Sequence, residues 1–148
     1  MTVSTDYMVE MFCRLANTPS PTGNTAKVMA LIEAELSRLG IDYVRTNKGA
    51  VLATLPGRND DKQRLLTAHV DTLGAMVKEI KENGRLKLDL IGGFAWNAVE
   101  GEHCMIETDS GRIITGTILS TKASVHVYGR EAGKMERTEE TMEVRLDE

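Results

Sequence analysis

The stretch that decides the fold is Leu65-Leu66-Thr67-Ala68-His69-Val70-Asp71, an apolar run that ends in a His-x-Asp triplet. An apolar run of this length predicts a strand, Arg64 to His69, that is buried on both faces. Open α/β sheets place their functional side chains at the carboxyl ends of such strands. The stretch therefore predicts an α/β domain that presents an imidazole and a carboxylate at the end of a buried strand.

The triplet has two interpretations, a metal site or a structural pair. Residues two apart on a strand project from the same face, so Asp71 can reach the imidazole of His69 or an ion bound there. Neutral imidazole is a common zinc ligand, and a nearby carboxylate fixes its tautomer. A bound ion lowers the pKa of its water to about 7, and two ions can flank a hydroxide nucleophile. A strand-end histidine can equally bond to a carboxylate for structural reasons, and spacing alone leaves both interpretations open.

Residues 1–72 have the pattern of a segment of an α/β domain: two helices and then strands of a mixed sheet. Thr5 is expected to cap a helix that opens on Asp6. Its apolar stripe consists of Tyr7, Met8, Met11, Phe12 and Leu15. A loop with two prolines follows, and Asn24 or Thr25 can cap a second helix that stops at Gly40. That helix has an apolar face of Val28, Met29, Ile32, Leu36 and Leu39. The runs 41–45 and 50–55, separated by a turn with Asn and Gly, predict a hairpin.

Residues 73–148 predict a second, β-rich domain, with a boundary near Thr72. Short strands alternate with turn signals and no convincing helix appears, which is typical of a small barrel or sandwich. Residues 85–90 alternate strictly between polar and apolar, so one face of that strand is expected to be packed. The charged stretch from Gly129 to Glu140 is expected to be a solvated loop. Residues 141–148 alternate up to the last position, which predicts that the polypeptide continues and that both domains are incomplete; an edge strand is the alternative.

Composition excludes several classes of protein. The net charge of −4, with both signs interspersed, gives no long-range field for nucleic acid. Cys13 and Cys104 lack Cys-x-x-Cys spacing, so a disulfide framework or a thiolate zinc site is not expected. The sequence shows neither a signal peptide nor an apolar run long enough to span a membrane. Together these observations predict a cytoplasmic protein that binds neither nucleic acid nor membrane.

The remaining ionisable residues give weaker candidates. Glu139 and Glu140 form an adjacent pair that could supply a base and a ligand, but their charged surroundings favour a solvated face. His103 is expected on a strand surface, and His126, with apolar neighbours, as a satisfied core or rim histidine rather than a ligand. Glu100 and Glu102 are expected along an exposed strand edge, so none of these residues completes a metal site with His69.

Several separated motifs, in order along the chain, resemble the N-terminal part of the M42 family of metallo-aminopeptidases, some of which were once labelled endoglucanases. The resemblance rests on residues 20–24, 65–77, 91–93, 99–101 and 137–148. It implies a catalytic α/β domain that holds two divalent ions, zinc or cobalt, and is interrupted by a PDZ-like β domain used in assembly. Members of the family remove N-terminal residues from peptides, commonly as tetrahedral dodecamers.

The resemblance implies roles for two residues of this chain. His69 matches the family's first metal-binding histidine, and Asp71 matches the aspartate that supports this histidine. Thr72 stands where many members carry an acidic residue. The family's other ligands and its general base correspond to positions beyond Glu148, and Glu139-Glu140 matches no catalytic pair. One histidine with one supporting aspartate cannot hold two ions, so the isolated chain is predicted to be inactive.

Two other classes of function remain as alternatives. The β domain could act as a binding or assembly module, with strand 141–147 pairing to a second molecule. Glycoside hydrolysis ranks last, because it needs two carboxyl groups that flank a sugar site, and no such pair is evident.

Overall fold

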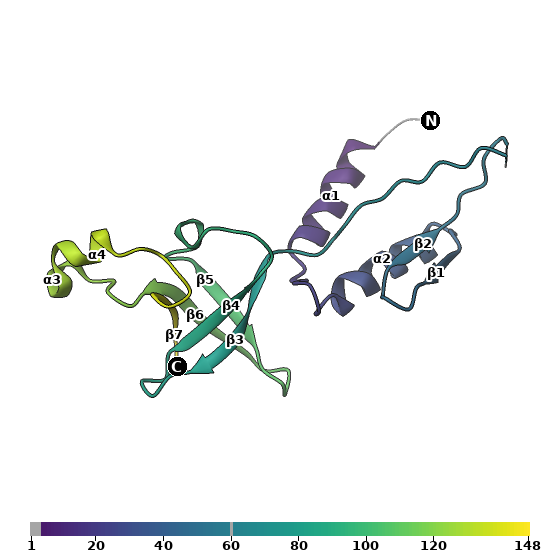
Figure 1. Cartoon of the computed structure of the whole chain (residues 1–148). Coiled ribbons are helices and arrows are strands. Elements are labelled where there is room, and N and C mark those ends of the chain that lie inside the picture. The colour runs from purple at the N-terminus through teal and green to yellow at the C-terminus, as the bar shows by residue number, and fades with distance from the viewer. Residues whose placement is uncertain (1–3, 60) are drawn as a thin grey trace. The chain divides into compact units, whose positions relative to one another are not determined.

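The computed structural model describes residues 4–59 and 61–148 and divides the chain into two units (Figure 1). The first unit ends at Leu73 and the second spans Gly74–Glu148. None of the helices in the described residues is long and apolar enough to cross a membrane.

The first unit begins with two helices, α1 at Thr5–Ala16 and α2 at Ala26–Arg38. The cap of α1 is Ser4 rather than Thr5, because the backbone N–H of Tyr7 donates to Ser4 Oγ at 3.3 Å. Thr25, one of the two residues expected there, occupies the N-cap position of α2, but its side chain makes no capping hydrogen bond. The apolar stripe of α1 is not covered within the described unit: α1 has no buried residue, and Phe12 is 70% exposed.

A polar cluster of Tyr7, Glu35 and Arg38 joins the two helices. The spacing of the apolar residues in the sequence did not predict it. The hydroxyl of Tyr7 donates to Glu35 Oε1 at 2.6 Å, and Arg38 donates to both oxygens of the same carboxylate at 3.0 and 2.6 Å. The Arg38 guanidinium, together with the Tyr7 hydroxyl, lowers the pKa of Glu35 to about 2. Glu35 is therefore a buried carboxylate with satisfied hydrogen bonds, on a helix whose other buried residues are the apolar Val28 and Met29.

The predicted hairpin forms, with β1 at Tyr43–Arg45 and β2 at Val51–Ala53 in antiparallel register. Its turn contains Gly49 at φ +88°, a conformation that glycine adopts without strain.

The predicted strand from Arg64 to His69 is wrong. Residues 63–71 adopt neither helix nor strand, and Leu65 and Leu66 are 76% and 95% exposed. A strand forms only where a neighbour takes up its backbone hydrogen bonds, and β1 and β2 pair with each other. The predicted mixed sheet is likewise not formed by the described residues of this unit. Parallel pairing there is limited to an isolated bridge between Pro21 and Thr72.

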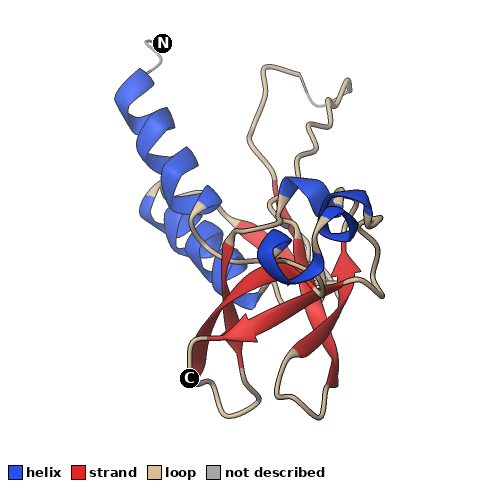
Figure 2. Cartoon of the chain, turned by 90° about the vertical axis from the view of Figure 1, so that its left-hand side faces the viewer, coloured by secondary structure: helices blue, strands red, loops and turns tan. Residues whose placement is uncertain are grey.

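The second unit is one antiparallel sheet of five strands, in the order β3-β4-β7-β6-β5. Its strands are drawn in red in Figure 2. The strands are β3 at Gly74–Ile80, β4 at Leu86–Ile91, β5 at His103–Glu107, β6 at Ile113–Ser120 and β7 at Met142–Leu146. A short 3-10 helix, η1 at Trp96–Ala98, precedes β5.

The core of this unit lies on the face that the alternation in 85–90 predicted. Leu86 and Leu88 are only 4% and 7% exposed. They pack with Trp96 from η1 and with Met142 and Val144 from β7, both of which are fully buried. The period-two pattern therefore predicted correctly which side of β4 is packed.

The last strand lies inside the sheet, not at its edge. β7 pairs with β6 from Gly116 and Leu146 to Ser120 and Met142, and with β4 through Leu86 and Val144. Both of its sides have partners, so the edge-strand interpretation of residues 141–148 is wrong. So is the idea that this strand pairs with a second molecule.

Two short helices correct the expectation that this unit has none. They are α3 at Val125–Tyr128 and α4 at Arg130–Lys134, and Ala132 of α4 is only 4% exposed. The stretch from Gly129 to Glu140 is thus not simply a solvated loop. Helices of four and five residues are too short for a 3.6-residue pattern to be seen in the sequence.

Candidate metal centre

The loop between α1 and α2 contacts Asp71 of the His69–Asp71 pair, and a tight turn determines its conformation. The backbone N–H of Asn24 donates to the carbonyl of Pro21 at 2.8 Å, which closes a β-turn with Thr22 and Gly23 at its centre. Gly23 has φ +96°, the conformation for which such a turn needs glycine at its third position. Thr22, in the second position, is thereby fixed at the apex of the turn.

Ser20 fastens this loop to the segment that carries the triplet. Its Oγ donates to the carbonyl of Val70 at 2.8 Å, and its own carbonyl accepts from the N–H of Thr72 at 3.0 Å. The Ser20 N–H in turn donates to Thr72 Oγ1 at 3.1 Å. Ser20 is fully buried, so each of these groups has exchanged water for a protein partner. The hydroxyl of Thr72 therefore acts as a hydrogen-bond acceptor that helps to hold the two segments together.

His69 and Asp71 meet beside the turn, although they are not on a strand. His69 Nδ1 lies 3.0 Å from Asp71 Oδ1, and the Thr22 hydroxyl donates to Asp71 Oδ2, also at 3.0 Å. The Thr22 hydroxyl, with a smaller contribution from His69, holds the pKa of the Asp71 carboxyl below its usual range, and partial burial opposes this only in part. An ionised carboxylate can only accept hydrogen bonds, so a hydrogen bond at this contact requires a proton on His69 Nδ1. In the neutral imidazole with that proton, Nε2 has a free lone pair, and the side chain is 84% exposed.

These residues fit one ligand of a metal ion and its support. A neutral histidine that donates one ring N–H to a carboxylate and offers its other nitrogen is how zinc-binding histidines are arranged. A catalytic zinc site takes three protein ligands. In the described ranges, 4–59 and 61–148, no group of three His, Cys, Asp or Glu side chains lies close enough to hold an ion. The described residues therefore supply part of a coordination shell, and no reaction step can be derived through a metal from them.

Comparison with protein families identifies the family to which the segment with His69 and Asp71 belongs. The profile of the M42 glutamyl aminopeptidase family matches residues 49–148, which include His69, Asp71 and the whole second unit. This chain belongs to the M42 family. The resemblance inferred from the motifs is thereby confirmed, and with it membership of an aminopeptidase family.

A curated relative is similar to this chain in sequence, and two solved structures are similar to it in fold. The putative aminopeptidase YhfE of Bacillus subtilis (strain 168) is 59% identical over 140 residues, which are 95% of this chain and 40% of YhfE. The TET aminopeptidase of the marine sediment archaeon Thaumarchaeota archaeon SCGC AB-539-E09 matches with a TM-score of 0.83 and 22% identity, over 97% of this chain and 39% of that one. PhTET1-12s, a dodecamer in the asymmetric unit of its crystal, matches with a TM-score of 0.76 and 22% identity, over 95% of this chain and 40% of that one.

The structural matches establish the fold only, a partial M42 α/β domain with strands in curled sheets. The chain spans about two fifths of the length of the curated M42 relative that it matches.

The other sequence candidates have partners or positions away from His69. Glu139 and Glu140, predicted to belong to a solvated face, form ion pairs with Lys78 and Lys87, each at 2.5 Å, which the sequence did not predict. His103 lies exposed on β5, as predicted, with Thr117 Oγ1 at 3.3 Å from its Nδ1.

Two of these expectations are wrong. His126 is exposed on α3 rather than in the core or at its rim, because its turn projects from the sheet. Glu100 is half-buried directly after η1, where Arg137 donates to both of its carboxylate oxygens at 2.9 and 3.2 Å. Glu100 therefore ties η1 to the segment after α4 and does not line an open strand edge.

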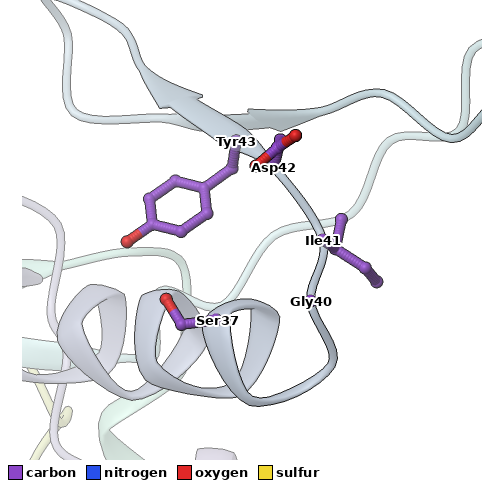
Figure 3. A pocket seen from close by; sticks show the side chains of 5 residues that line it. All are labelled: Ser37, Gly40, Ile41, Asp42 and Tyr43. Atoms are coloured by element: carbon purple, nitrogen blue, oxygen red, sulfur yellow. The ribbon is translucent and has the colours of Figure 1, made fainter.

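A hollow in the first unit is lined by residues other than those of the metal centre. Ser37 at the end of α2 and Tyr43 at the start of β1 point toward each other across it (Figure 3). Its volume of about 250 Å³ is below the range of about 300–1,000 Å³ typical of ligand pockets. It does not include His69 or Asp71, so we assign it no ligand.

Proposed function

We propose that this chain contributes the first metal ligand of a two-metal aminopeptidase that removes N-terminal residues from peptides. His69 binds one of two divalent ions, zinc or cobalt, and Asp71 holds the imidazole in the tautomer that exposes Nε2. The observation that carries the proposal is the 3.0 Å contact between His69 Nδ1 and Asp71 Oδ1, which leaves the other ring nitrogen exposed. Membership of the M42 family supports the reaction.

We further propose that the isolated 148-residue chain does not catalyse this reaction. A hydrolytic metal site needs several ligands for each ion and a base within reach of the attacking water. The described residues bring no third ligand to His69 and Asp71. We expect the purified chain to hold no stoichiometric metal and to release no amino acid from peptides, measured by elemental analysis and an aminopeptidase assay. Tightly bound zinc or cobalt with peptide turnover would contradict this proposal.

A chimera tests the function itself. This chain replaces the matching 140-residue stretch of the Bacillus subtilis relative, and hydrolysis of aminoacyl p-nitroanilides is measured with added zinc or cobalt. We expect metal-dependent hydrolysis that His69→Ala abolishes. His103→Ala is the matched control, because it removes another exposed histidine that lies on β5. A folded chimera that keeps its activity without His69, or that never hydrolyses a peptide, refutes the proposed role.

Assembly into a homo-oligomer is a second proposal, supported by the dodecameric structural neighbour. Within the described sheet the strands with one open side are β3 and β5, so we assign any sheet-to-sheet pairing to these edges and not to β7. We propose that the second unit is the PDZ-like assembly domain of the family. Size-exclusion chromatography with light scattering tests this directly, and a monomer at all concentrations contradicts it.

We also propose a cytoplasmic location. Cys13 and Cys104 are both free, and secreted domains of this size more commonly pair their cysteines.

A further inference from the structure

We propose that Thr22 is a positioning residue for the metal ligand His69, and that it acts through the carboxylate of Asp71. This inference rests on the proposed function, since it concerns how the ligand is held. Thr22 lies 49 positions before Asp71 in the chain and is brought to it by the loop between α1 and α2.

The two carboxylate oxygens of Asp71 have different hydrogen-bond partners, which is the observation that supports a positioning role for Thr22. Oδ1 accepts from His69 Nδ1 and Oδ2 accepts from the Thr22 hydroxyl. The terminal torsion of an aspartate is broad, so a single hydrogen bond leaves the carboxylate plane free to rotate. A second hydrogen bond, from Thr22 to the opposite oxygen, fixes that plane. It thereby also fixes the position of Oδ1, the atom that accepts from His69.

Thr22 can serve as an anchor because its own position is fixed. It occupies the second position of the turn closed between Pro21 and Asn24. Ser20, the residue just before this turn, is fully buried and hydrogen-bonded to both Val70 and Thr72. The anchor and the segment that carries the triplet are therefore parts of one hydrogen-bonded unit.

The consequence for His69 concerns its tautomer. A free imidazole prefers the proton on Nε2, which would leave no lone pair on the exposed nitrogen. A fixed Asp71 carboxylate favours the proton on Nδ1 and leaves Nε2 able to bind an ion. Because His69 is 84% exposed, hydrogen bonds rather than packing set this preference.

The experiment measures the tautomer of His69 in the 148-residue chain by nitrogen-15 and carbon-13 NMR, with no metal or substrate added. The pH is held where the imidazole is neutral. We expect mainly the Nδ1–H form in the unchanged chain. Thr22→Val and Thr22→Ala should each lower the ratio of the Nδ1–H form to the Nε2–H form about threefold, the size expected for losing one hydrogen bond. Thr22→Ser keeps a hydroxyl and should restore the ratio.

Thr25→Val is the matched control. Thr25 lies three residues further along the same loop, and its side chain makes no capping hydrogen bond. We expect this variant to keep the tautomer of the unchanged chain. An unaltered ratio in both Thr22→Val and Thr22→Ala, or an equal drop in Thr25→Val, overturns the inference. The readout requires no catalysis, so an inactive chimera would refute the proposed function and leave the tautomer result standing.

Discussion

Each unit of this chain contains an apolar segment that the sequence predicts to be a strand, and the two segments differ in burial. In the second unit, Leu86 and Val144 face each other across paired strands and are almost fully buried. In the first unit, Leu65 and Leu66 lie in the apolar run that predicted a buried strand, and they are exposed. The difference is the presence of a neighbouring strand. An apolar run becomes a buried strand only where another strand pairs with it.

The two units also differ in the interactions that hold their core and site residues in place. Packing fixes the core of the second unit, where Trp96 and Met142 belong to one cluster. Hydrogen bonds fix the metal centre of the first unit, where Ser20 and Thr22 hold the segment around His69 and Asp71. We therefore expect stability to depend chiefly on volume in the second unit and on individual polar contacts in the first.

The largest effect is expected from Met142→Ala. Met142 is fully buried, so truncation leaves a cavity and should lower the free energy of unfolding of the second unit by about 2–5 kcal/mol. Trp96 is the single tryptophan of the chain and lies in that core, so urea denaturation followed by its fluorescence measures the loss.

Two controls sharpen this prediction. Met105→Ala makes the same change at a side chain that is 65% exposed, and Leu66→Ala truncates a side chain that is 95% exposed. Each should change the free energy of unfolding by less than about 0.5 kcal/mol, measured for Leu66 by far-ultraviolet circular dichroism. A loss at Leu66 as large as that at Met142 would show that the first unit buries this side chain, and the comparison would fail.

A smaller loss is expected from Gly116→Ala, at the place where β6 lies closest to β7. A Cβ atom at Gly116 would lie 2.7 Å from Val144 Cγ1 and 2.8 Å from the carbonyl oxygen of Arg145. The backbone would have to move, and we expect a loss of about 1–3 kcal/mol in the same fluorescence measurement.

Gly133→Ala is the matched control for Gly116→Ala. Gly133 lies in α4, and an added Cβ meets nothing within 4 Å. Replacing a helical glycine there should be neutral or stabilise by up to about 1 kcal/mol. Equal losses in the two variants would mean that the approach of β6 to β7 is not the cause.

The sequence predicted the local elements of both units better than their packing. Helices α1 and α2, the β1–β2 hairpin and the packed face of β4 follow from periodicity and turn residues, which act over a few positions. The fate of residues 64–69 and of 142–146 depends on which strand lies alongside, and periodicity does not contain that information. The run at 64–69 was therefore predicted buried and is exposed, and the alternating segment at 142–146, for which an edge strand was the alternative, lies inside the sheet.

The candidate site was predicted in part for the same reason. His69 and Asp71 are neighbours in sequence, so their contact could be expected from spacing. The contacts of Asp71 with Thr22 and of Thr72 with Ser20 join residues about 50 positions apart. A glycine and two prolines in the loop signalled a tight turn, but nothing in the sequence showed what the turn faces.

The last prediction compares the acid sensitivity of one buried carboxylate in each unit. Burial alone would raise the pKa of Glu143, but ion pairs with Lys81 and Arg85 outweigh it and leave the pKa lowered. The pKa of Glu35 is lowered to about 2 by Arg38 and Tyr7. A carboxylate with a lowered pKa stabilises the folded state above its ordinary pKa, and that contribution is lost as the pH falls toward the folded value.

We therefore expect stability to fall in both units below about pH 4.5, and for Glu35 the fall extends to about pH 2. Glu143→Gln should flatten the acid dependence of Trp96 fluorescence unfolding, and Glu35→Gln should flatten that of the helical signal in circular dichroism. The effect at neutral pH should be larger for Glu143, whose side chain is 4% exposed, because the Arg38 partner of Glu35 is 60% exposed and can return to water. If Glu35→Gln alters the fluorescence transition as strongly as Glu143→Gln does, the two units unfold together and the contrast between them does not extend to stability.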